Sequence, residues 1–178
     1  MVSSINLQNL IYSEALAQGV PPAIALAVAQ QESGTSQWNS NGSLVTGTSG
    51  EVGVFQLMPQ TAASLGVDPT DVNENISGGI AFLAQLYQKY GNWPAALSAY
   101  NSGSPTGSPS YANSVLSIAS SLASSVSSAV TSALAPESDS GGDVTAADLT
   151  SGVASPISGT LVVGLILGGI ALAWWALD

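Results

Sequence analysis

The feature that most constrains the fold of this chain is a run of 21 residues without a charge at 157–177. A helix rises about 1.5 Å per residue, so this run is long enough to cross the roughly 30 Å hydrocarbon core of a bilayer. Trp174 and Trp175 lie at its end, where indole rings favour the membrane interface. The sequence therefore predicts one transmembrane helix over 157–177, which would anchor the chain to a lipid bilayer by its C-terminal helix.

The residues before this run fall into three zones of different composition. Residues 1–118 mix apolar and polar side chains at regular spacing and are expected to form one globular domain. Residues 119–135 consist almost entirely of small and apolar types, which favours a Ser/Ala-rich helical extension. Residues 136–156 hold Pro, Gly, Asp and Ser with little to bury, so we expect a flexible acidic linker.

Apolar residues at helical spacing, separated by prolines and glycines, predict a mainly α domain with a long loop or small hairpin at 35–52. The expected helix starts are Ser4, Pro21, Pro59 or Gln60, Ser77, Pro94 and Tyr111. In this interpretation Ser77 caps the fourth helix, and the buried side chains of that helix are Ile80, Leu83, Leu86 and Tyr87.

The helix expected at 111–134 has apolar residues at every third or fourth position. This face can pack on the domain, pair with a second copy or lie on a membrane, and the sequence does not choose between them. Gly164 and Gly168 give the 157–177 run a small-residue spacing that supports helix pairing. Self-association through either helix is therefore kept as an alternative.

Composition excludes several kinds of chemistry. The chain has no Cys and no His, which excludes an ordinary zinc site, a Ser-His-Asp triad and a thiolate nucleophile. Lys89 is the one cationic side chain in a chain of net charge −10, so nucleic acid and anionic lipid headgroups are not expected as partners. No metal or other cofactor is expected either. Proton transfer falls to 11 carboxylates, several of them in the acidic linker.

Glu32 has the most distinctive position among these carboxylates. It follows the apolar helical stretch 24–29 and precedes a chain reversal at Gly34. Burial among apolar neighbours and the negative end of the helix dipole would both raise its pKa, which keeps a carboxyl protonated as a general acid requires. Position alone nevertheless favours an ordinary solvated residue at a helix end.

Four short motifs change that balance: Glu32-Ser33-Gly34, the stretch GVFQLMPQT at 53–61, Glu74-Asn75-Ile76 followed by Gly79, and Ala99-Tyr100-Asn101-Ser102-Gly103. In this order and spacing they resemble the catalytic domain of the soluble-type lytic transglycosylases, which shares its fold with goose-type lysozyme. The resemblance covers residues 8–118, and the stretch 111–116 resembles the start of the family's last helix. It implies a lysozyme-like helical catalytic domain.

The resemblance also implies a peptidoglycan lytic transglycosylase, which cuts glycan strands between N-acetylmuramic acid and N-acetylglucosamine. Glu32 would protonate the glycosidic oxygen and then accept the proton of the muramic C6 hydroxyl, which closes onto C1 to give a 1,6-anhydro sugar. The substrate-binding residues implied in the same way are Ser33, Gln56, Met58, Asn75, Tyr100 and Asn101.

Several of these implied roles have a structural alternative. Tyr100 would bring its hydroxyl to Glu32 or to the scissile oxygen. The alternatives are a plain helix end for Ser33, core packing for Met58, a helix cap for Asn75 and a loop brace for Asn101.

Two other functions are kept as alternatives. A lysozyme-type muramidase would hydrolyse the same bond, with Glu51 as a second carboxylate, and an inactive peptidoglycan-binding or structural membrane protein would not cut it. The first residues lack the basic start and apolar core of a secretory signal. A C-terminal anchor without such a signal suggests an unusual export route to the bacterial membrane, or a bacteriophage protein in the virion membrane or particle.

Overall fold

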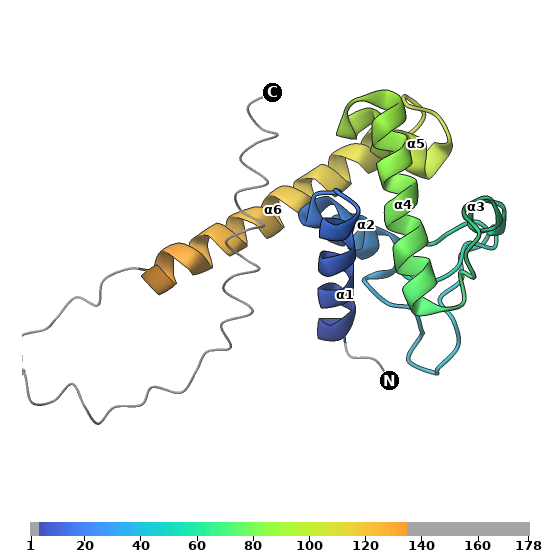
Figure 1. The fold of residues 1–178 in the computed structure, drawn as a ribbon, viewed down its shortest axis with the longest axis horizontal. Coiled ribbons are helices and arrows are strands. Elements are labelled where there is room, and N and C mark those ends of the chain that lie inside the picture. Colours follow the sequence, from blue (N-terminus) through green and yellow to red (C-terminus); the bar gives the residue numbers. More distant parts are fainter. Residues whose placement is uncertain (1–3, 135–178) are drawn as a thin grey trace, which may run out of the picture. The chain divides into compact units, whose positions relative to one another are not determined.

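The structure is a computed structural model that describes residues 4–134, and this part of the chain is built from α-helices joined by loops (Figure 1). The helices are α1 (Ser4–Ala17), α2 (Pro22–Ser33), α3 (Pro59–Leu65), α4 (Val72–Tyr90), α5 (Trp93–Ser102) and α6 (Pro109–Leu134). Within residues 4–134 the only extended pairings are isolated antiparallel bridges between positions 38 and 57. The predicted mainly α fold is confirmed, whereas the linker at 136–156 and the transmembrane helix at 157–177 lie outside the described residues.

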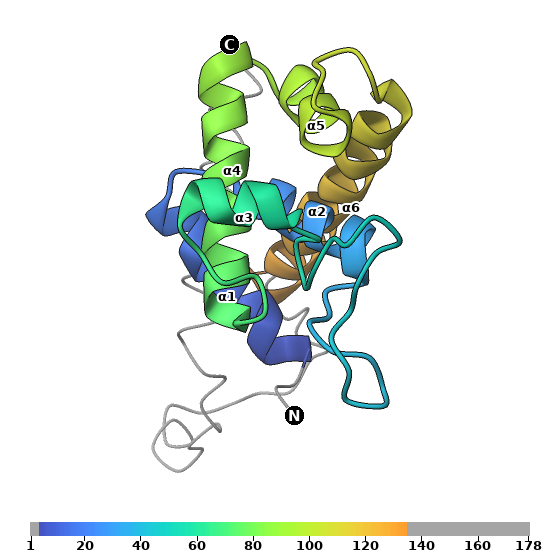
Figure 2. The same ribbon diagram turned by 90° about the vertical axis from the view of Figure 1, so that its right-hand side faces the viewer.

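Helix α4 is central to the packing of the domain. It packs against α1, α3 and α5, and α1 also packs against α2; Figure 2 shows α3 crossing α4. Aliphatic side chains with almost no exposed surface fill these interfaces, among them Ile11 of α1, Ile24 of α2 and Leu83 of α4. Burying each such side chain contributes about 1.5–3 kcal/mol. This core fixes the position of α2, the helix that carries Glu32.

The start of α4 differs from the sequence prediction, because the helix begins well before Ser77. The carboxylate of Asp71 caps it by accepting hydrogen bonds from the backbone N–H groups of Asn73 and Glu74 at 2.9 and 3.0 Å. Ser77 lies inside the helix, where its carbonyl accepts a hydrogen bond of 3.1 Å from the side chain of Gln18 in α1. A carboxylate at this end is favoured by the helix dipole as well as by the two N–H groups.

The expected burial of Tyr87 is also wrong. Its side chain is 38% exposed, and its ring stacks on Trp93 of α5 with the ring centroids 4.5 Å apart. Trp93 is 4% exposed and fills the core in its place.

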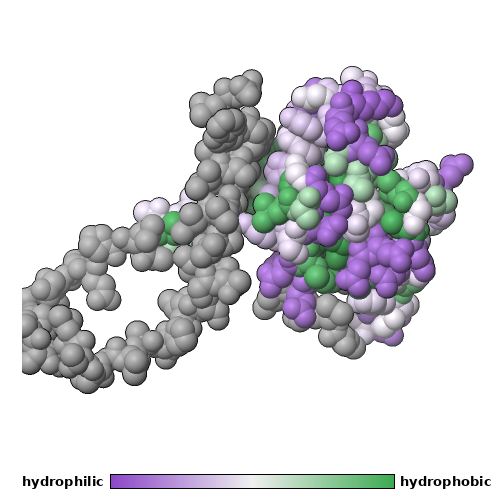
Figure 3. Space-filling model, in the orientation of Figure 1, coloured by the Kyte–Doolittle hydropathy of each residue, from purple (hydrophilic) through white to green (hydrophobic). Residues whose placement is uncertain are grey.

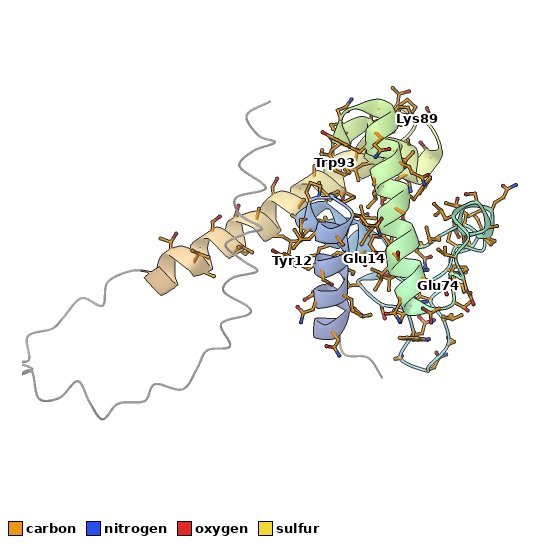
Figure 4. The ribbon with its side chains drawn as sticks, viewed as in Figure 1. Tyr12, Glu14, Glu74, Lys89 and Trp93 are labelled. Carbon is orange, nitrogen blue, oxygen red and sulfur yellow. The ribbon has the colours of Figure 1, made fainter. Side chains whose placement is uncertain are left out.

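The two ends of α4 carry side chains of opposite charge. Glu74 and Lys89 lie at opposite ends of α4, in the first and the last turn, where each sign complements the helix dipole (Figure 4). Over the face of the domain in Figure 3, polar and apolar residues alternate in small patches.

Helix α6 runs without a break through the domain boundary predicted at residue 118. It begins at Pro109 rather than at Tyr111, since proline suits the first turn of a helix. Its residues up to Ala123 form one compact unit with the rest of the described domain, and its last turns from Ser124 belong to a second unit. The division of the chain into domain, extension, linker and anchor stays a prediction.

The apolar face of α6 packs on the domain over its first turns. Ala112, Val115 and Ala119 are buried there, and Leu122 is 37% exposed. Within the described part of the chain, the segment Pro109–Ser132 is long and apolar enough to cross a membrane, with a mean hydropathy of 1.3, although only 11% of its most apolar stretch is buried. Length and composition alone do not separate a spanning helix from a surface helix, so membrane contact and self-association through α6 stay predictions.

Candidate active site

Glu32 lies in the last turn of α2, just before the glycine that ends the helix. Gly34 adopts φ 63° and ψ 30°, a left-handed conformation that turns the chain away from the helix axis. The carboxyl of Glu32 is half-buried, and burial raises its pKa above the ordinary value of 4.5. The environment therefore shifts Glu32 toward the protonated form that a general acid needs.

Two neighbouring side chains act on the pKa of Glu32 in opposite directions. The hydroxyl of Tyr111, in α6, donates a hydrogen bond of 2.5 Å to Oε1 of Glu32, which lowers the pKa of that carboxyl. The negative charge of Glu51, in the loop between α2 and α3, raises it. Burial is the largest of the three effects, and the pKa of Glu32 is raised overall.

Tyr111 is the site residue that the sequence prediction missed. Burial and then the negative charge of Glu32 raise the pKa of its phenol, so the hydroxyl keeps its proton and stays a donor. One turn further along α6, Ser114 donates a hydrogen bond of 2.8 Å to Oε1 of Gln31. Two adjacent side-chain pairs therefore join the end of α2 to α6. The motif at 111–116 marked the helix that carries Tyr111, but it gave no direction for the side chain.

Tyr100 has a different partner from the one expected. Its hydroxyl donates a hydrogen bond of 2.7 Å to the carbonyl of Phe55, not to Glu32. Its ring lies against that of Phe82, with the centroids 5.3 Å apart and the planes tilted by 45°. Burial and then the negative charge of Glu32 raise the pKa of Tyr100, so it also stays neutral. Tyr100 thus supports the loop that contains Phe55, and its contact with the scissile oxygen stays a prediction.

Ser33 also supports this loop. Its Oγ lies 2.9 Å from the carbonyl of Val54 and 3.2 Å from that of Ala29, and it accepts a hydrogen bond of 3.0 Å from the N–H of Ser36. The hydroxyl is thus engaged with the backbone on three sides. A contact with the N-acetyl group of a substrate stays a prediction.

Gln56 and Glu51 approach the same backbone at Gly47. A Cβ added to Gly47 would lie 2.2 Å from Oε2 of Glu51 and 3.0 Å from Oε1 of Gln56, so a larger residue there would displace the end of the Glu51 side chain. The amide nitrogen of Gln56 donates to the carbonyl of Gly53 at 2.7 Å, and Oε2 of Glu51 accepts from the N–H of Ser49 at 3.0 Å. These bonds fix two polar side chains in the loop before α3.

Met58 is the residue just before α3, and its side chain is 40% exposed. Its sulfur and methyl group are therefore not part of the core, so the core-packing alternative is wrong. Its contact with a sugar face stays a prediction.

The side-chain amides of Asn75 and Asn101 differ in burial. Asn75 has no exposed surface, and its side chain bonds to backbone groups of Val52, Phe55 and Pro69. A side chain without exposed surface does not reach a substrate, and this amide bonds to loop backbone rather than to the end of a helix. Both the substrate contact and the helix cap expected for Asn75 are therefore wrong. Asn101 is exposed, and its Oδ1 accepts a hydrogen bond of 2.6 Å from Ser108, which braces the loop between α5 and α6.

The described residues contain no group of three or more His, Cys, Asp or Glu side chains placed to hold a metal ion. The carboxyl of Glu32 lies beside the Tyr111 hydroxyl, and the charge of Glu51 in the loop before α3 acts on it. A carboxylic acid with a raised pKa and one oxygen already hydrogen-bonded is suited to donating its proton from the other oxygen.

The family relationship follows from residues 9–110, which match the transglycosylase SLT domain and make up more than half of the chain. The chain belongs to this family. The resemblance indicated by the sequence motifs is thereby confirmed. The matched range includes every predicted site residue, and it ends one residue before Tyr111.

Two known proteins illustrate the relationship. The transglycosylase of Enterobacteria phage PRD1 is 38% identical over 84 residues, which are 47% of this chain and 29% of the phage protein. This chain therefore spans less than a third of that relative's length. The lytic transglycosylase Slt of Pseudomonas aeruginosa, solved as an inactive mutant, superposes with a TM-score of 0.55 at 21% identity, over 67% of this chain and 24% of that one. At this identity the likeness is one of fold, and it agrees with the predicted helical transglycosylase fold.

Proposed function

We propose that this chain is a peptidoglycan lytic transglycosylase that cuts the β-1,4 bond between N-acetylmuramic acid and N-acetylglucosamine and leaves a 1,6-anhydro end. Membership of the transglycosylase family supports the reaction class. The observation that carries the proposal is the half-buried carboxyl of Glu32, with a raised pKa and a tyrosine hydroxyl on one oxygen. Glycoside cleavage needs such an acid at the leaving oxygen.

The proposed reaction uses Glu32 twice. Because Tyr111 donates to Oε1, the acid proton of Glu32 is carried by Oε2. That proton passes to the glycosidic oxygen as its bond to C1 of the muramic sugar breaks. The C6 oxygen of the same sugar then bonds to C1, and its proton returns to the carboxylate of Glu32. No water is consumed, and the acid is regenerated.

The neighbours of Glu32 have supporting roles in this proposal. Tyr111 holds the carboxyl in one orientation, and it keeps its hydrogen bond when the carboxylate forms. Gln56 and Asn101 are the polar side chains proposed to hold sugar hydroxyls and amides, with the exposed Met58 beside them as an apolar contact. The raised pKa of both Tyr111 and Tyr100 keeps their hydroxyls protonated, so neither phenol adds a negative charge beside Glu32.

The proposal is tested by replacing Glu32 with Gln, which keeps the size and the acceptor for Tyr111 but carries no acid proton. We expect release of anhydro-muropeptides from purified sacculi to fall by about 10²–10⁴-fold, the usual contribution of a general acid. Mass spectrometry of the soluble products is the measurement, with circular dichroism to show that the variant is folded. Undiminished release by the variant would remove Glu32 from the mechanism.

Hydrolysis of the same bond is the second candidate function, because the charge of Glu51 is close enough to Glu32 to raise its pKa. A second carboxylate near the acid can activate a water molecule in glycosidases. The same mass spectra separate the two reactions, since hydrolysis leaves ends that are heavier by one water than anhydro ends. The absence of anhydro ends from the wild-type digest would favour hydrolysis.

We further propose that the chain acts in a bacteriophage particle. The support is its 38% identity over 84 residues to the transglycosylase of Enterobacteria phage PRD1, together with the apolar run at 157–177 that would attach it to a membrane. Mass spectrometry of purified particles and of membranes from uninfected cells tests this setting. Detection of the protein only in uninfected cells would contradict it.

A further inference from the structure

Two buried amide side chains, those of Gln37 and Asn75, meet at the same short stretch of the loop between α2 and α3. Neither has any exposed surface. Gln37 follows α2 by a few residues, whereas Asn75 comes from the first turns of α4. A buried amide needs partners for both its oxygen and its nitrogen, so its bonds indicate what holds it in place.

Each amide accepts a backbone N–H from this loop. Oε1 of Gln37 accepts the N–H of Val54 at 2.8 Å, and Oδ1 of Asn75 accepts the N–H of Phe55 at 2.9 Å. Nδ2 of Asn75 donates in return to the carbonyl of Val52 at 2.8 Å. The two side chains thus form the backbone hydrogen bonds that a neighbouring strand would form in a sheet.

The same two amides bind the turn that leads into α4. Nε2 of Gln37 donates to the carbonyls of Pro69 and Thr70 at 3.1 and 3.3 Å, and Nδ2 of Asn75 donates to Pro69 at 2.9 Å. Gly53 makes this approach possible, because a Cβ there would lie 2.3 Å from Oε1 of Gln37 and 2.5 Å from Nδ2 of Asn75. Gln37 and Asn75 form what we call the amide clamp between the loop and the turn.

The clamped loop meets the candidate active site on its other side. The carbonyl of Val54 accepts a hydrogen bond from Ser33, the neighbour of the acid in sequence, and the carbonyl of Phe55 accepts one from Tyr100. The next residue, Gln56, has φ 44°, a strained conformation for a residue with a side chain. Such strain persists only where the surrounding structure imposes it. Val54 and Phe55 thus bond to the clamp through their N–H groups and to Ser33 and Tyr100 through their carbonyls.

We infer that Gln37 is a positioning residue for the proposed reaction. Its amide, together with that of Asn75, holds the loop so that Gln56 keeps its strained conformation and the backbone keeps its bonds to Ser33. Gln37 acts through the loop, since it has no surface with which to touch a substrate. The inference rests on the proposed function, because it names a residue that supports the same site.

The test uses the full-length chain with Gln37→Leu, which keeps the approximate volume but removes both the acceptor for Val54 and the donor to Pro69. We expect kcat on sacculi to fall by about tenfold or more, because small displacements of positioned groups slow a reaction strongly. The pH profile of kcat/KM supplies a second readout. A loosened loop admits water to Glu32, so the alkaline limb is expected to move to lower pH.

Two further variants separate positioning from stability. Gln37→Glu in its neutral form keeps an oxygen for the N–H of Val54 and a hydroxyl for the carbonyl of Pro69. A buried carboxyl stays neutral at acid pH. At the acidic end of the profile, kcat of this variant is therefore expected to lie within about threefold of the wild-type value. Ile11→Val shortens a fully buried side chain of α1 and lowers stability without touching the clamp. It is expected to lower Tm with no change in kcat or in the pH profile.

The outcomes are distinct from those for the proposed function itself. The inference is supported if kcat falls in Gln37→Leu, stays close to the wild-type value in Gln37→Glu at acid pH, and is unchanged in Ile11→Val. A folded Gln37→Leu with wild-type kcat and pH profile overturns it, and so does equal loss of kcat in Ile11→Val. If Gln37→Leu does not fold, a Gln37→Glu variant as inactive at acid pH as at neutral pH overturns it. Failure of the proposed function is judged separately, by Glu32→Gln and by the mass of the products.

Discussion

The hydroxyl of Tyr111, near the start of α6, donates a hydrogen bond of 2.5 Å to Oε1 of Glu32, at the end of α2. The two residues are 79 positions apart in sequence, so the contact exists only because α6 packs through Val115 onto the domain core. It engages Oε1 of Glu32, so Oε2 is the oxygen that would reach the substrate in the proposed mechanism.

Replacement of Tyr111 by Phe is expected to move the alkaline limb of the kcat/KM profile to higher pH. The hydrogen bond from Tyr111 lowers the pKa of Glu32, so its removal raises that pKa further. We also expect about a tenfold loss of kcat at the optimum, because the carboxylate that forms in the reaction loses a donor. Initial rates on sacculi across the pH range are the measurement. Tyr87→Phe, which removes the hydroxyl of an exposed tyrosine on α4 and keeps its ring, is a matched control. An unshifted limb in Tyr111→Phe would contradict the assigned contact.

Replacement of Glu51 by Gln is expected to shift the same limb in the opposite direction. The charge of Glu51 raises the pKa of Glu32, so the neutral variant should have a lower pKa at Glu32 and an alkaline limb at lower pH. Since Glu51 is partly exposed, the shift should shrink in salt, which screens charges over a Debye length of about 10 Å at 0.1 M. Retained anhydro products with a shifted limb indicate a through-space effect. A collapse of activity, with products one water heavier in the wild type, would instead make Glu51 the base of a hydrolase.

The helices could be predicted from the sequence because their boundary signals act locally. Pro22 and Pro59 each lie in the first turn of a helix, and Gly34 ends α2 in the left-handed conformation that glycine adopts without strain. The start of α4 was missed because Asp71 and Ser77 are both good caps. The choice between them is made by packing, since Ile76 must lie inside the helix to reach the core.

The candidate site was predictable only in part, because several of its contacts depend on long-range packing rather than on local signals. Glu32 was predicted from the motifs around it, because its place at a helix end alone favours an ordinary solvated residue. Which of Tyr100 and Tyr111 reaches Glu32 depends on how α5 and α6 are oriented, and that is set by long-range packing. Gln37 had no sequence signal at all, because glutamines in polar loops are ordinarily exposed. Its burial becomes visible only once the loop and the turn before α4 are brought together.

The pH dependence of stability provides a test of the environment of Glu32 that needs no substrate. A carboxyl with a raised folded-state pKa holds its proton more tightly in the folded chain than in the unfolded chain. Its contribution to stability is therefore full below the unfolded value of 4.5 and is lost as pH rises through the folded pKa. The Glu32→Gln variant has no such loss.

We therefore expect Glu32→Gln to match the wild type in free energy of unfolding at about pH 4 and to exceed it at about pH 8. Urea unfolding at both values is the measurement, and the titration of all other carboxylates cancels in the difference. The Ile11→Val variant, which changes no titrating group, is the control and should alter stability equally at both pH values. A pH-independent gap between Glu32→Gln and the wild type would mean that Glu32 is not desolvated.

The tightness of the amide clamp can be measured with two glycine substitutions that differ only in their surroundings. Gly53 and Gly50 both have positive φ, at 79° and 93°, so an alanine at either position costs about 1–2 kcal/mol in backbone strain. At Gly50 an added Cβ meets nothing within 4 Å, whereas at Gly53 it would lie 2.3 Å from Oε1 of Gln37 and 2.5 Å from Nδ2 of Asn75. Gly53→Ala is therefore expected to lower the free energy of unfolding by about 1–3 kcal/mol more than Gly50→Ala, the usual cost of overpacking. Equal losses in the two variants would mean that the amides can withdraw, and that the loop before α3 is not held as tightly as its hydrogen bonds indicate.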